Sequence, residues 1–437
     1  MIENKKHIVQ IVIKNTSTLD FTIPLFWHIK NRHENVKISI LYCVFDRKEI
    51  LRNSFFFTDF CREYNIQVYD FSDFLKWKSP LLKSILKNSR NDRMTFFEIK
   101  NKLKNINIGA FVDLARLILY RVKLIALRRS INFSSILPKI SPDVVFFDNR
   151  NDTSFIGRDE IFSYLYSYKP PTYLIPHAPH MRDAISEFCP FDERGDELPD
   201  FCYFMIPFKY GTPWIGREAK KDQFFVSGYP GLDSDWLKYC KKDNADMQDK
   251  VVVNLLFIIR RFLPKGVKRT ADTDIFIIDY EEFIKPLRLI KNSILKSNKD
   301  IHLIIKPHPA NNYRELEKVM KLEGIKSWEI SHEPMYGLLS KVDVVCSLAS
   351  TVLLIPAMAN IPTIIFDTSL QQKIHKRWDR LAKLYCGMDF YLDDNSKFQN
   401  ALNESLGEAV GCDIKNNIRN FFDYEMSMAI SQKIGIE

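Results

Sequence analysis

HIVQIVI at residues 7–13 and VKISILYCVF at residues 36–45 are apolar, β-branched runs typical of buried strands. Residues 20–32, which lie between them, repeat apolar side chains at helical spacing. A helical stretch over residues 48–64 and a further strand over residues 66–71 continue the alternation. Strand and helix that alternate in this order predict a parallel, doubly wound α/β sheet.

The alternation resumes later in the first half of the chain, with strands expected over residues 144–147, 173–175 and 223–227. A helix is expected over residues 159–168, between the first two of these strands. Residues 189–216 contain four prolines and three glycines, which favours irregular loops that line a cleft.

The turn sequence Gly228-Tyr229-Pro230-Gly231 marks a domain boundary, because a second α/β alternation follows it. The expected strands of this second half are 251–259, 301–305, 328–330, 342–346 and 363–366, and its expected helices are 280–297, 312–323, 335–340 and one from 351. We therefore expect one domain over residues 1–230, a second over 231–412, and a C-terminal helix over 413–437.

The composition fits a globular protein with two cores, since 46% of the 437 residues are hydrophobic. No uninterrupted apolar stretch reaches about 18 residues, so we expect no membrane-spanning helix. The run at residues 7–13 is broken by Lys14 and lacks a small-residue cleavage site, which favours a first strand over a signal peptide. The eight cysteines include no C-x-x-C pair, so we expect no metal site, buried free thiols such as Cys43 and Cys346, and a cytoplasmic location.

The net charge of +9 is concentrated in a basic helical insertion at residues 81–130. Between Lys83 and Arg129, twelve Lys and Arg residues face three acidic residues, and the difference equals the whole excess. Such a segment is most often a solvated helical face. The alternative is peripheral contact with an anionic membrane surface or an acidic polymer.

Lys306-Pro307-His308-Pro309, which we call the HP loop, directly follows an expected strand of the second domain. Two prolines stiffen this turn and hold His308 at the sheet edge, where ligands of open parallel sheets bind. There the imidazole can donate to a phosphate oxygen, and Lys306 adds positive charge. The alternative is a histidine that only caps the next helix.

Cys346-Ser347-Leu348-Ala349-Ser350-Thr351, which we call the ST loop, joins another expected strand to a helix. Its small hydroxyl residues let the backbone approach an anion at a helix N-terminus. The alternative is an ordinary serine N-cap. Together the HP and ST loops predict a phosphate or pyrophosphate site built from Lys306, His308, Ser347, Ser350 and Thr351. Arg260, with Arg261 beside it, follows the strand 251–259 and is expected either to neutralise the same phosphate or to lie exposed in a loop.

The pair Lys306-Pro307-His308-Pro309 and Ser347…Ser350-Thr351 resembles the HP and S/ST motifs of bacterial capsule and surface-polysaccharide transferases. These include sialyl- and polysialyltransferases, Kdo transferases and CDP-glycerol glycerophosphotransferases. The resemblance covers residues 225–367 and implies a GT-B-like fold: two doubly wound Rossmann-type domains that face a cleft, with C-terminal helices crossing back. It also implies that His308, Ser350 and Thr351 hold the phosphate of the donor.

Many of these transferases follow the Ser-Thr pair with the pattern S-T-x-x-x-E-A, in which the acidic residue contacts a ribose. Here Ile355 stands in that place. This departure favours the sialyltransferase-like branch, which uses cytidine nucleotides, over UDP-sugar transferases.

The general base is expected in loops of the first domain that face the cleft. Asp148 and Asp152 follow the strand 144–147, and Pro176-His177-Ala178-Pro179-His180 follows the strand 173–175, with Asp183 close behind. We assign the base to His177 or Asp148 and treat His180, Asp152 and Asp183 as acceptor-side candidates. For each of them a structural or substrate-positioning role is the alternative.

The hypothesis is therefore a glycosyltransferase that moves an acidic sugar, of the sialic acid or Kdo type, from a CMP-activated donor to a capsule or surface glycan. The second domain would bind the nucleotide and the first the oligo- or polysaccharide acceptor, which can be lipid-linked at the cytoplasmic face of the membrane. Neither a metal cofactor nor a nucleic-acid partner is expected. The alternatives are a CDP-glycerol- or UDP-sugar-dependent transferase, a nucleotide-sugar epimerase on the same fold, and a non-catalytic membrane-associated scaffold.

Overall fold

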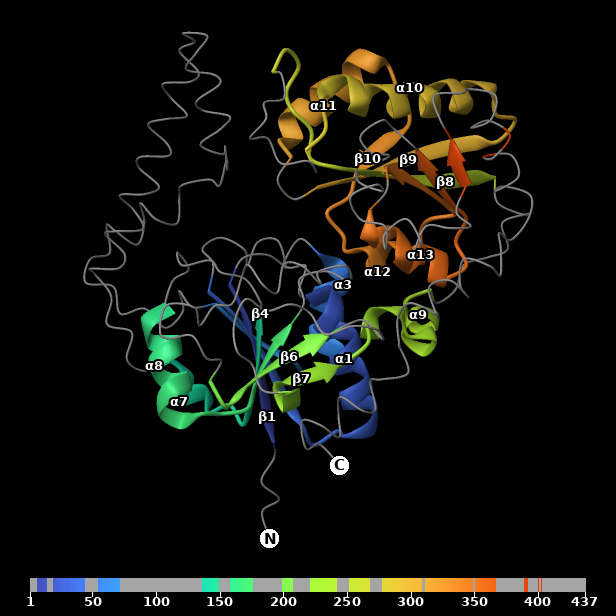
Figure 1. The fold of residues 1–437 in the computed structure, drawn as a ribbon. Helices are drawn as coiled ribbons and strands as arrows, with labels where there is room; N and C mark the ends of the chain where they lie inside the picture. The colour runs from blue at the N-terminus through green and yellow to red at the C-terminus, as the bar shows by residue number, and fades with distance from the viewer. Residues whose placement is uncertain are drawn as a thin grey trace, which may run out of the picture.

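The structure of the chain is a computed structural model, and it contains two α/β domains (Figure 1). It describes residues 6–13, 19–43, 54–70, 136–148, 158–175, 199–206, 221–241, 251–267, 277–308, 311–348, 350–366, 389–391, 400 and 402. The basic insertion expected over residues 81–130 and the helix expected over residues 413–437 lie outside these ranges.

The first domain is built on a parallel sheet whose strand order is β3-β2-β1-β4-β5-β6-β7. Its strands are β1 (His7–Val12), β2 (Lys37–Tyr42), β3 (Gln67–Asp70), β4 (Val144–Asp148), β5 (Thr172–Ile175), β6 (Cys202–Ile206) and β7 (Phe224–Val226). The chain runs outward from β1 to β3 and then returns to the other side of β1 with β4. This reversal makes the sheet doubly wound, as the sequence predicts.

Helices cover both faces of the first sheet because successive strand residues point to opposite sides. Ile8 and Phe146 belong to the core on one face, and Val9 and Phe147 belong to the core on the other. Helices α1 (Leu19–Arg32) and α3 (Phe55–Glu63) pack on the first face, and α7 (Ile136–Ile140) and α8 (Arg158–Tyr168) pack on the second.

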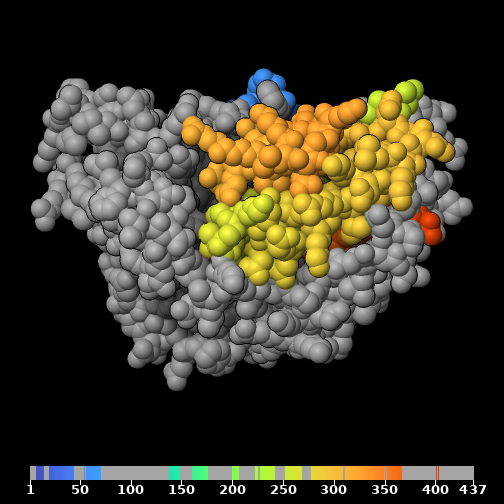
Figure 2. All heavy atoms as spheres, turned by 90° about the horizontal axis from the view of Figure 1, so that it is seen from above, coloured from blue at the N-terminus to red at the C-terminus, as the bar shows by residue number. Residues whose placement is uncertain are grey.

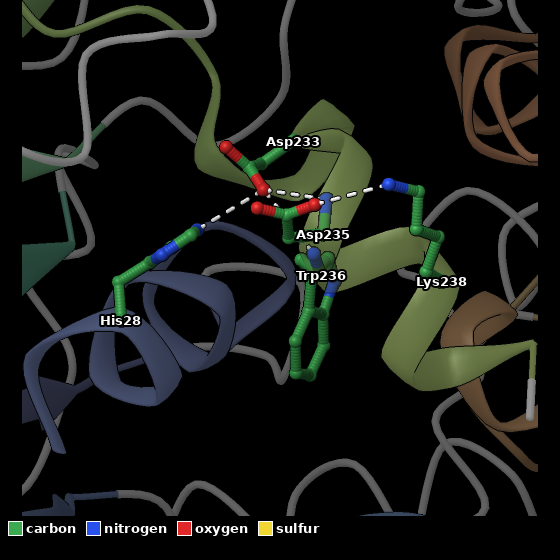
Figure 3. Close-up of polar contacts among 5 residues, drawn as sticks. All are labelled: His28, Asp233, Asp235, Trp236 and Lys238. Atoms are coloured by element: carbon green, nitrogen blue, oxygen red, sulfur yellow. Dashed lines mark hydrogen bonds and ion pairs between the residues drawn. The ribbon is translucent and has the colours of Figure 1, made fainter. Parts of the chain in front are cut away.

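A short connection, η5 (Pro230–Leu232) and α9 (Ser234–Cys240), leads to the second domain but is anchored to the first. Asp233 accepts hydrogen bonds from the main-chain N–H groups of Asp235 and Trp236, so it caps α9. The same carboxylate lies 3.3 Å from Nε2 of His28 on α1, as Figure 3 shows. Burial acts to raise the pKa of Asp233, but the His28 imidazole and the two main-chain N–H groups together keep it below its usual range.

The second domain repeats the design with a parallel sheet in the order β10-β9-β8-β11-β12-β13. Its strands are β8 (Val252–Ile259), β9 (Asp300–Pro307), β10 (Trp328–Ile330), β11 (Val344–Leu348), β12 (Thr363–Phe366) and β13 (Asp389–Tyr391). The strand order reverses between β8 and β11, so this sheet too is doubly wound.

The helices of the second domain are α10 (Tyr280–Lys296), α11 (Tyr313–Glu323), α12 (Met335–Leu338), η7 (Thr351–Leu353) and α13 (Leu354–Met358). Helices α12 and α13 lie between the second sheet and the first domain, where α12 contacts α3 and α13 contacts η5 (Figure 1). Helices α10 and α11 lie on the opposite face, and they form much of the described surface seen from above (Figure 2). None of the helices within the described ranges has the length and apolar character needed to cross a membrane.

The structure corrects several boundaries that the sequence suggests. Residues 189–216 are not loops throughout, since β6 lies within them between β5 and β7. Strand β9 continues through Lys306 and Pro307, and β11 includes Ser347 and Leu348, so both strands extend into the expected loops. Pairing extends both strands: Lys306 and Pro307 pair with the end of β8, Ser347 pairs with Ile258 of β8, and Leu348 pairs with Phe366 of β12.

The C-terminal edges of the two sheets face each other. Helices α1 and α3 follow β1 and β2, so their N-termini lie at the C-terminal edge of the first sheet. Tyr336, after β10, donates a hydrogen bond to the main-chain oxygen of Asp20 in the first turn of α1. Ser54, at the N-cap of α3, donates to Glu333, which also follows β10. Two Rossmann-type sheets that meet in this way form a GT-B-like fold.

Candidate functional site

The candidate donor site lies where β8, β9 and β11 end. Ile258 on β8 pairs with Lys306 on one side and with Ser347 on the other. Parallel strands end at the same sheet edge, so the HP and ST loops leave the sheet on either side of the β8 exit. Two strand spacings separate β9 from β11, which is about 10 Å. Side chains of the two loops can therefore reach one ligand only across Arg260, which follows β8.

A buried amide joins the β8 exit to the HP loop. Asn311 Oδ1 accepts a hydrogen bond from the Phe262 main-chain N (3.3 Å), and Asn311 Nδ2 donates to the Arg260 main-chain oxygen (3.0 Å). His308 is tied to the same place, because its main-chain N donates to the oxygen of Ile259 at 3.0 Å. These bonds fix the backbones of Arg260 and His308 side by side. Sequence reasoning missed Asn311, although a polar residue just after a strand-end turn could have suggested it.

His308 and Arg260 differ in exposure. The His308 side chain is exposed at the sheet edge, where a ligand can reach it, and the Arg260 side chain is half-buried. A half-buried guanidinium and an exposed imidazole, both held beside a strand end, are suited to bind an anion.

The residues of the ST loop fall into two groups. Ser347 is fully buried within β11, and its hydroxyl is near two main-chain oxygens, that of Ile258 at 2.9 Å and that of Leu348 at 2.7 Å. In this geometry Ser347 holds β11 to β8 and is not available to a ligand. Ser350 is half-buried, and its main-chain oxygen accepts a hydrogen bond from Leu353 N (3.0 Å) where η7 begins. Thr351 is the first residue of η7, and its side chain lies outside what the structure describes.

Lys306 lies at the contact surface between the two domains, which we call the seam. Its Nζ donates a hydrogen bond to the main-chain oxygen of Glu333, and its charge interacts with the carboxyl of Asp20 on α1. Burial lowers the pKa of Lys306, while Asp20 and Glu333 oppose that change. The structure thus places Lys306 beside the candidate donor site, with its ammonium group held by contacts between the two domains.

Asp20 and Glu333 are functional candidates that sequence reasoning missed. Burial raises the pKa of the Asp20 carboxyl to about 7, and the charge of Lys306 opposes part of that rise. The Glu333 side chain is 6% exposed, and its Oε2 accepts hydrogen bonds from Ser54 Oγ (2.8 Å) and the Phe56 main-chain N (3.3 Å). No local pattern marks either residue, since each acquires its partner only when the domains meet.

The acceptor side is described only in part. Asp148 is the last residue of β4, at the C-terminal edge of the first sheet and beside the point where its strand order reverses. The other acceptor-side candidates lie outside the described residues: Asp152, His177, His180 and Asp183. Among the described residues, His, Cys, Asp and Glu side chains form no group of three that could hold a metal ion. Cys43 and Cys346 are buried free thiols, as predicted.

Comparisons with known proteins give structural likenesses only. No protein-family model and no curated protein matches the sequence. A UDP-N-acetylglucosamine 2-epimerase is similar at 10% identity and a TM-score of 0.47, over 99% of this chain and 95% of that one. A glycosyltransferase from Rickettsia africae is similar at 12% identity and a TM-score of 0.43, over 99% and 98% of the two chains. The wall teichoic acid polymerase TagF is similar at 9% identity and a TM-score of 0.45, over 98% and 88%. With TM-scores below 0.5, these likenesses assign no activity to this chain.

Proposed function

We propose that the chain is a glycosyltransferase that binds a nucleotide-activated sugar at the exits of β8, β9 and β11. One observation carries the proposal: Ile258 pairs with both Lys306 and Ser347, so the HP and ST loops leave one sheet edge on either side of β8. Ligands of open parallel sheets bind at this edge, where the strand order reverses. In this proposal His308, Arg260, Ser350 and Thr351 contact the phosphate of the donor.

The proposed reaction needs charge stabilisation on the donor side. An acceptor hydroxyl attacks the anomeric carbon, the bond from that carbon to the phosphate oxygen breaks, and the nucleotide leaves with the bonding electrons. Arg260 and His308, with their backbones held together by Asn311, stabilise the charge that develops on the leaving phosphate. A base in the first domain takes the proton of the hydroxyl, and Asp148 or His177 fills that role.

The donor is a CMP-linked acidic sugar of the sialic acid or Kdo type, and the acceptor is a capsule or surface glycan. Support for the cytidine nucleotide comes from Ile355, which is buried within α13 where many of the transferases that the sequence resembles have an acidic residue that contacts a ribose. A lipid-linked acceptor would bring the enzyme to the cytoplasmic face of the membrane, where the basic residues of the segment 81–130 suit an anionic surface.

The decisive experiment measures nucleotide binding by titration calorimetry. We expect CMP to bind the wild-type protein and His308→Ala to weaken that binding about 10- to 100-fold, which is the effect of losing one hydrogen bond to a charged group. His302→Ala is the matched control, because His302 lies on the same strand away from the sheet edge and its Nδ1 is 2.8 Å from Ser327 Oγ.

Other outcomes would redirect or reject the proposal. Tighter binding of CDP or UDP than of CMP would move the donor to CDP-glycerol or a UDP-sugar. Conversion of a free nucleotide-sugar in the absence of any acceptor would identify an epimerase. Equal affinity of the wild type and His308→Ala for every nucleotide would remove the donor site from this edge.

A further inference from the structure

Glu333 joins the two domains through its side chain. The residue belongs to the second domain, three positions after β10, yet its Oε2 accepts hydrogen bonds from Ser54 Oγ (2.8 Å) and from Phe56 N (3.3 Å) in the first domain. The carboxylate is almost fully buried, at 6% exposure of the residue. Buried charges are expensive unless hydrogen bonds satisfy them, so these two bonds stabilise the contact strongly.

The partner of Glu333 is the start of a helix, where negative charge is favourable. Helix α3 leaves main-chain N–H groups free in its first turn and carries a partial positive charge there. Ser54 serves both sides of the contact, since its Oγ accepts from Phe57 N (3.2 Å) while it donates to Glu333. Glu333 therefore extends the N-terminal cap of α3 from the other domain.

A glycine makes the close approach possible. A Cβ added to Gly337 on α12 would lie 2.7 Å from the Cβ of Phe56 and 3.1 Å from Oε2 of Glu333. Real Cβ atoms are almost never found as close as the first of these distances. The two domains are therefore so close at this point that there is no room for a side chain on residue 337. The contact between α12 and α3 depends on this glycine.

The same residue reaches the candidate donor site. The main-chain oxygen of Glu333 accepts a hydrogen bond from Lys306 Nζ, and Lys306 lies two residues before His308 at the end of β9. Glu333 and the strand end that carries the candidate phosphate ligand are therefore tied together within the second domain and move as one relative to the first domain.

We propose that Glu333 is a positioning residue, a latch that holds the two sheet edges at the spacing needed for transfer between donor and acceptor. When its carboxylate leaves Ser54 and the start of α3, the seam opens on that side, and water solvates both partners. The expected effect of Glu333 on transfer rests on the proposed function, whereas its expected effect on the spacing of the domains does not.

The direct test measures the distance between the domains. Spin labels on noncanonical residues at Tyr168 and Leu322, which are 67% and 83% exposed, report the spacing by pulsed electron resonance. We expect a single distance for the wild type and a second, longer one for Glu333→Ala. Glu333→Gln keeps an acceptor oxygen and should stay closer to the wild type. Glu329→Ala removes an exposed carboxylate of β10 and should leave the distribution unchanged.

Kinetics distinguish a latch from a merely structural residue. Glu333→Ala should lower kcat about tenfold, the effect of losing a hydrogen bond to a charged group, and leave the Kd for nucleotide within about twofold. His308→Ala should instead weaken the nucleotide Kd. Should Glu333→Ala fail to fold, Ser54→Ala, which removes the 2.8 Å bond from the other side, and Gly337→Ala, which crowds Phe56, make the same test.

The two proposals fail in different ways. An unchanged distance distribution in folded Glu333→Ala, Ser54→Ala and Gly337→Ala would overturn the latch whatever the protein binds. A lengthened distance in a protein that binds no nucleotide would keep the latch and overturn the transferase.

Discussion

Asn311 is the residue that sets the geometry of the candidate donor site without having to touch a ligand. Its side chain makes one hydrogen bond as acceptor, from Phe262 N, and one as donor, to Arg260 O. It is 7% exposed, so both bonds are shielded from water. A rigid backbone at Arg260 and His308 means that binding an anion there costs little ordering entropy.

Asn311→Ala removes both bonds, and we expect it to weaken nucleotide binding about tenfold, as measured by calorimetry. Asn311→Asp keeps the acceptor for Phe262 N but loses the donor and adds a negative charge near the site. Its nucleotide binding should be weaker still, because the added negative charge repels the phosphate.

Asn254→Ala is the control for this prediction. Asn254 lies on β8, away from the C-terminal edge of the sheet, and its Nδ2 donates a comparable hydrogen bond to the main-chain oxygen of Lys341 (2.7 Å). Equal nucleotide affinity in Asn311→Ala and the wild type would show that the two loops hold their geometry without the amide.

At the scale of elements, η5, which belongs to the connection between the two domains, is tightly packed where the domains meet. A Cβ on Gly231 would lie 1.9 Å from Tyr336 Oη, 2.8 Å from Tyr229 Cε1 and 2.9 Å from the main-chain oxygen of Asp20. The last of these atoms is backbone and cannot rotate away. The turn sequence Gly228–Gly231, which the sequence suggests as a domain boundary, thus contains a close-packed contact between α1, η5 and α12.

We expect Gly231→Ala to lower the free energy of unfolding by about 1–3 kcal/mol, the usual cost of overpacking, and to lower the melting temperature accordingly. Gly266→Ala isolates the cost of backbone strain, because no atom lies within 4 Å of its added Cβ and its φ of +83° costs an L-residue about 1–2 kcal/mol. A melting temperature of Gly231→Ala equal to that of the wild type would mean that the packing at η5 can yield.

At the scale of the whole molecule, the meeting of the two domains changes the chemistry of the groups between them. Asp20 lies in the first turn of α1, next to Lys306 of the second domain, and burial raises the pKa of its carboxyl to about 7 while the charge of Lys306 opposes part of that rise. An unfolded chain would ionise the same group near pH 3.9. Folding therefore takes up a proton on Asp20 between about pH 4 and pH 7.

The sign of the pH dependence follows from that raised pKa. The stabilising contribution of protonated Asp20 is present at low pH and is lost as the pH rises towards 7, at about 1.4 kcal/mol for each unit of raised pKa. Asp20→Asn cannot ionise, so its free energy of unfolding relative to the wild type should increase between pH 5 and pH 8 in urea titrations. Asp235→Asn, which replaces an exposed carboxylate on α9, is the matched control. A difference between Asp20→Asn and the wild type that stays constant with pH would contradict the burial of this group.

The sequence by itself determined the class of the fold. Continuous apolar runs such as residues 251–259 and amphipathic stretches such as residues 280–297 specify local structure through side-chain periodicity, and their order specifies two doubly wound sheets. The placement of the HP and ST loops at one sheet edge followed from the same logic, because parallel strands end together. The sequence did not predict strand β6, because its five residues lie among prolines and glycines that indicate loops.

The tertiary structure alone decided the roles of residues whose partners are distant in the chain. Ser347 was expected to face a ligand, but pairing with β8 extends β11 and buries its hydroxyl against Ile258. Lys306 was expected to contact a phosphate, but its ammonium group donates a hydrogen bond to Glu333. The side chain of Glu333 in turn accepts one from Ser54, which is 279 positions away in the chain. The physical reason is that burial and hydrogen-bond partners are properties of the assembled domains, whereas periodicity reports only on the neighbours of a residue along the chain.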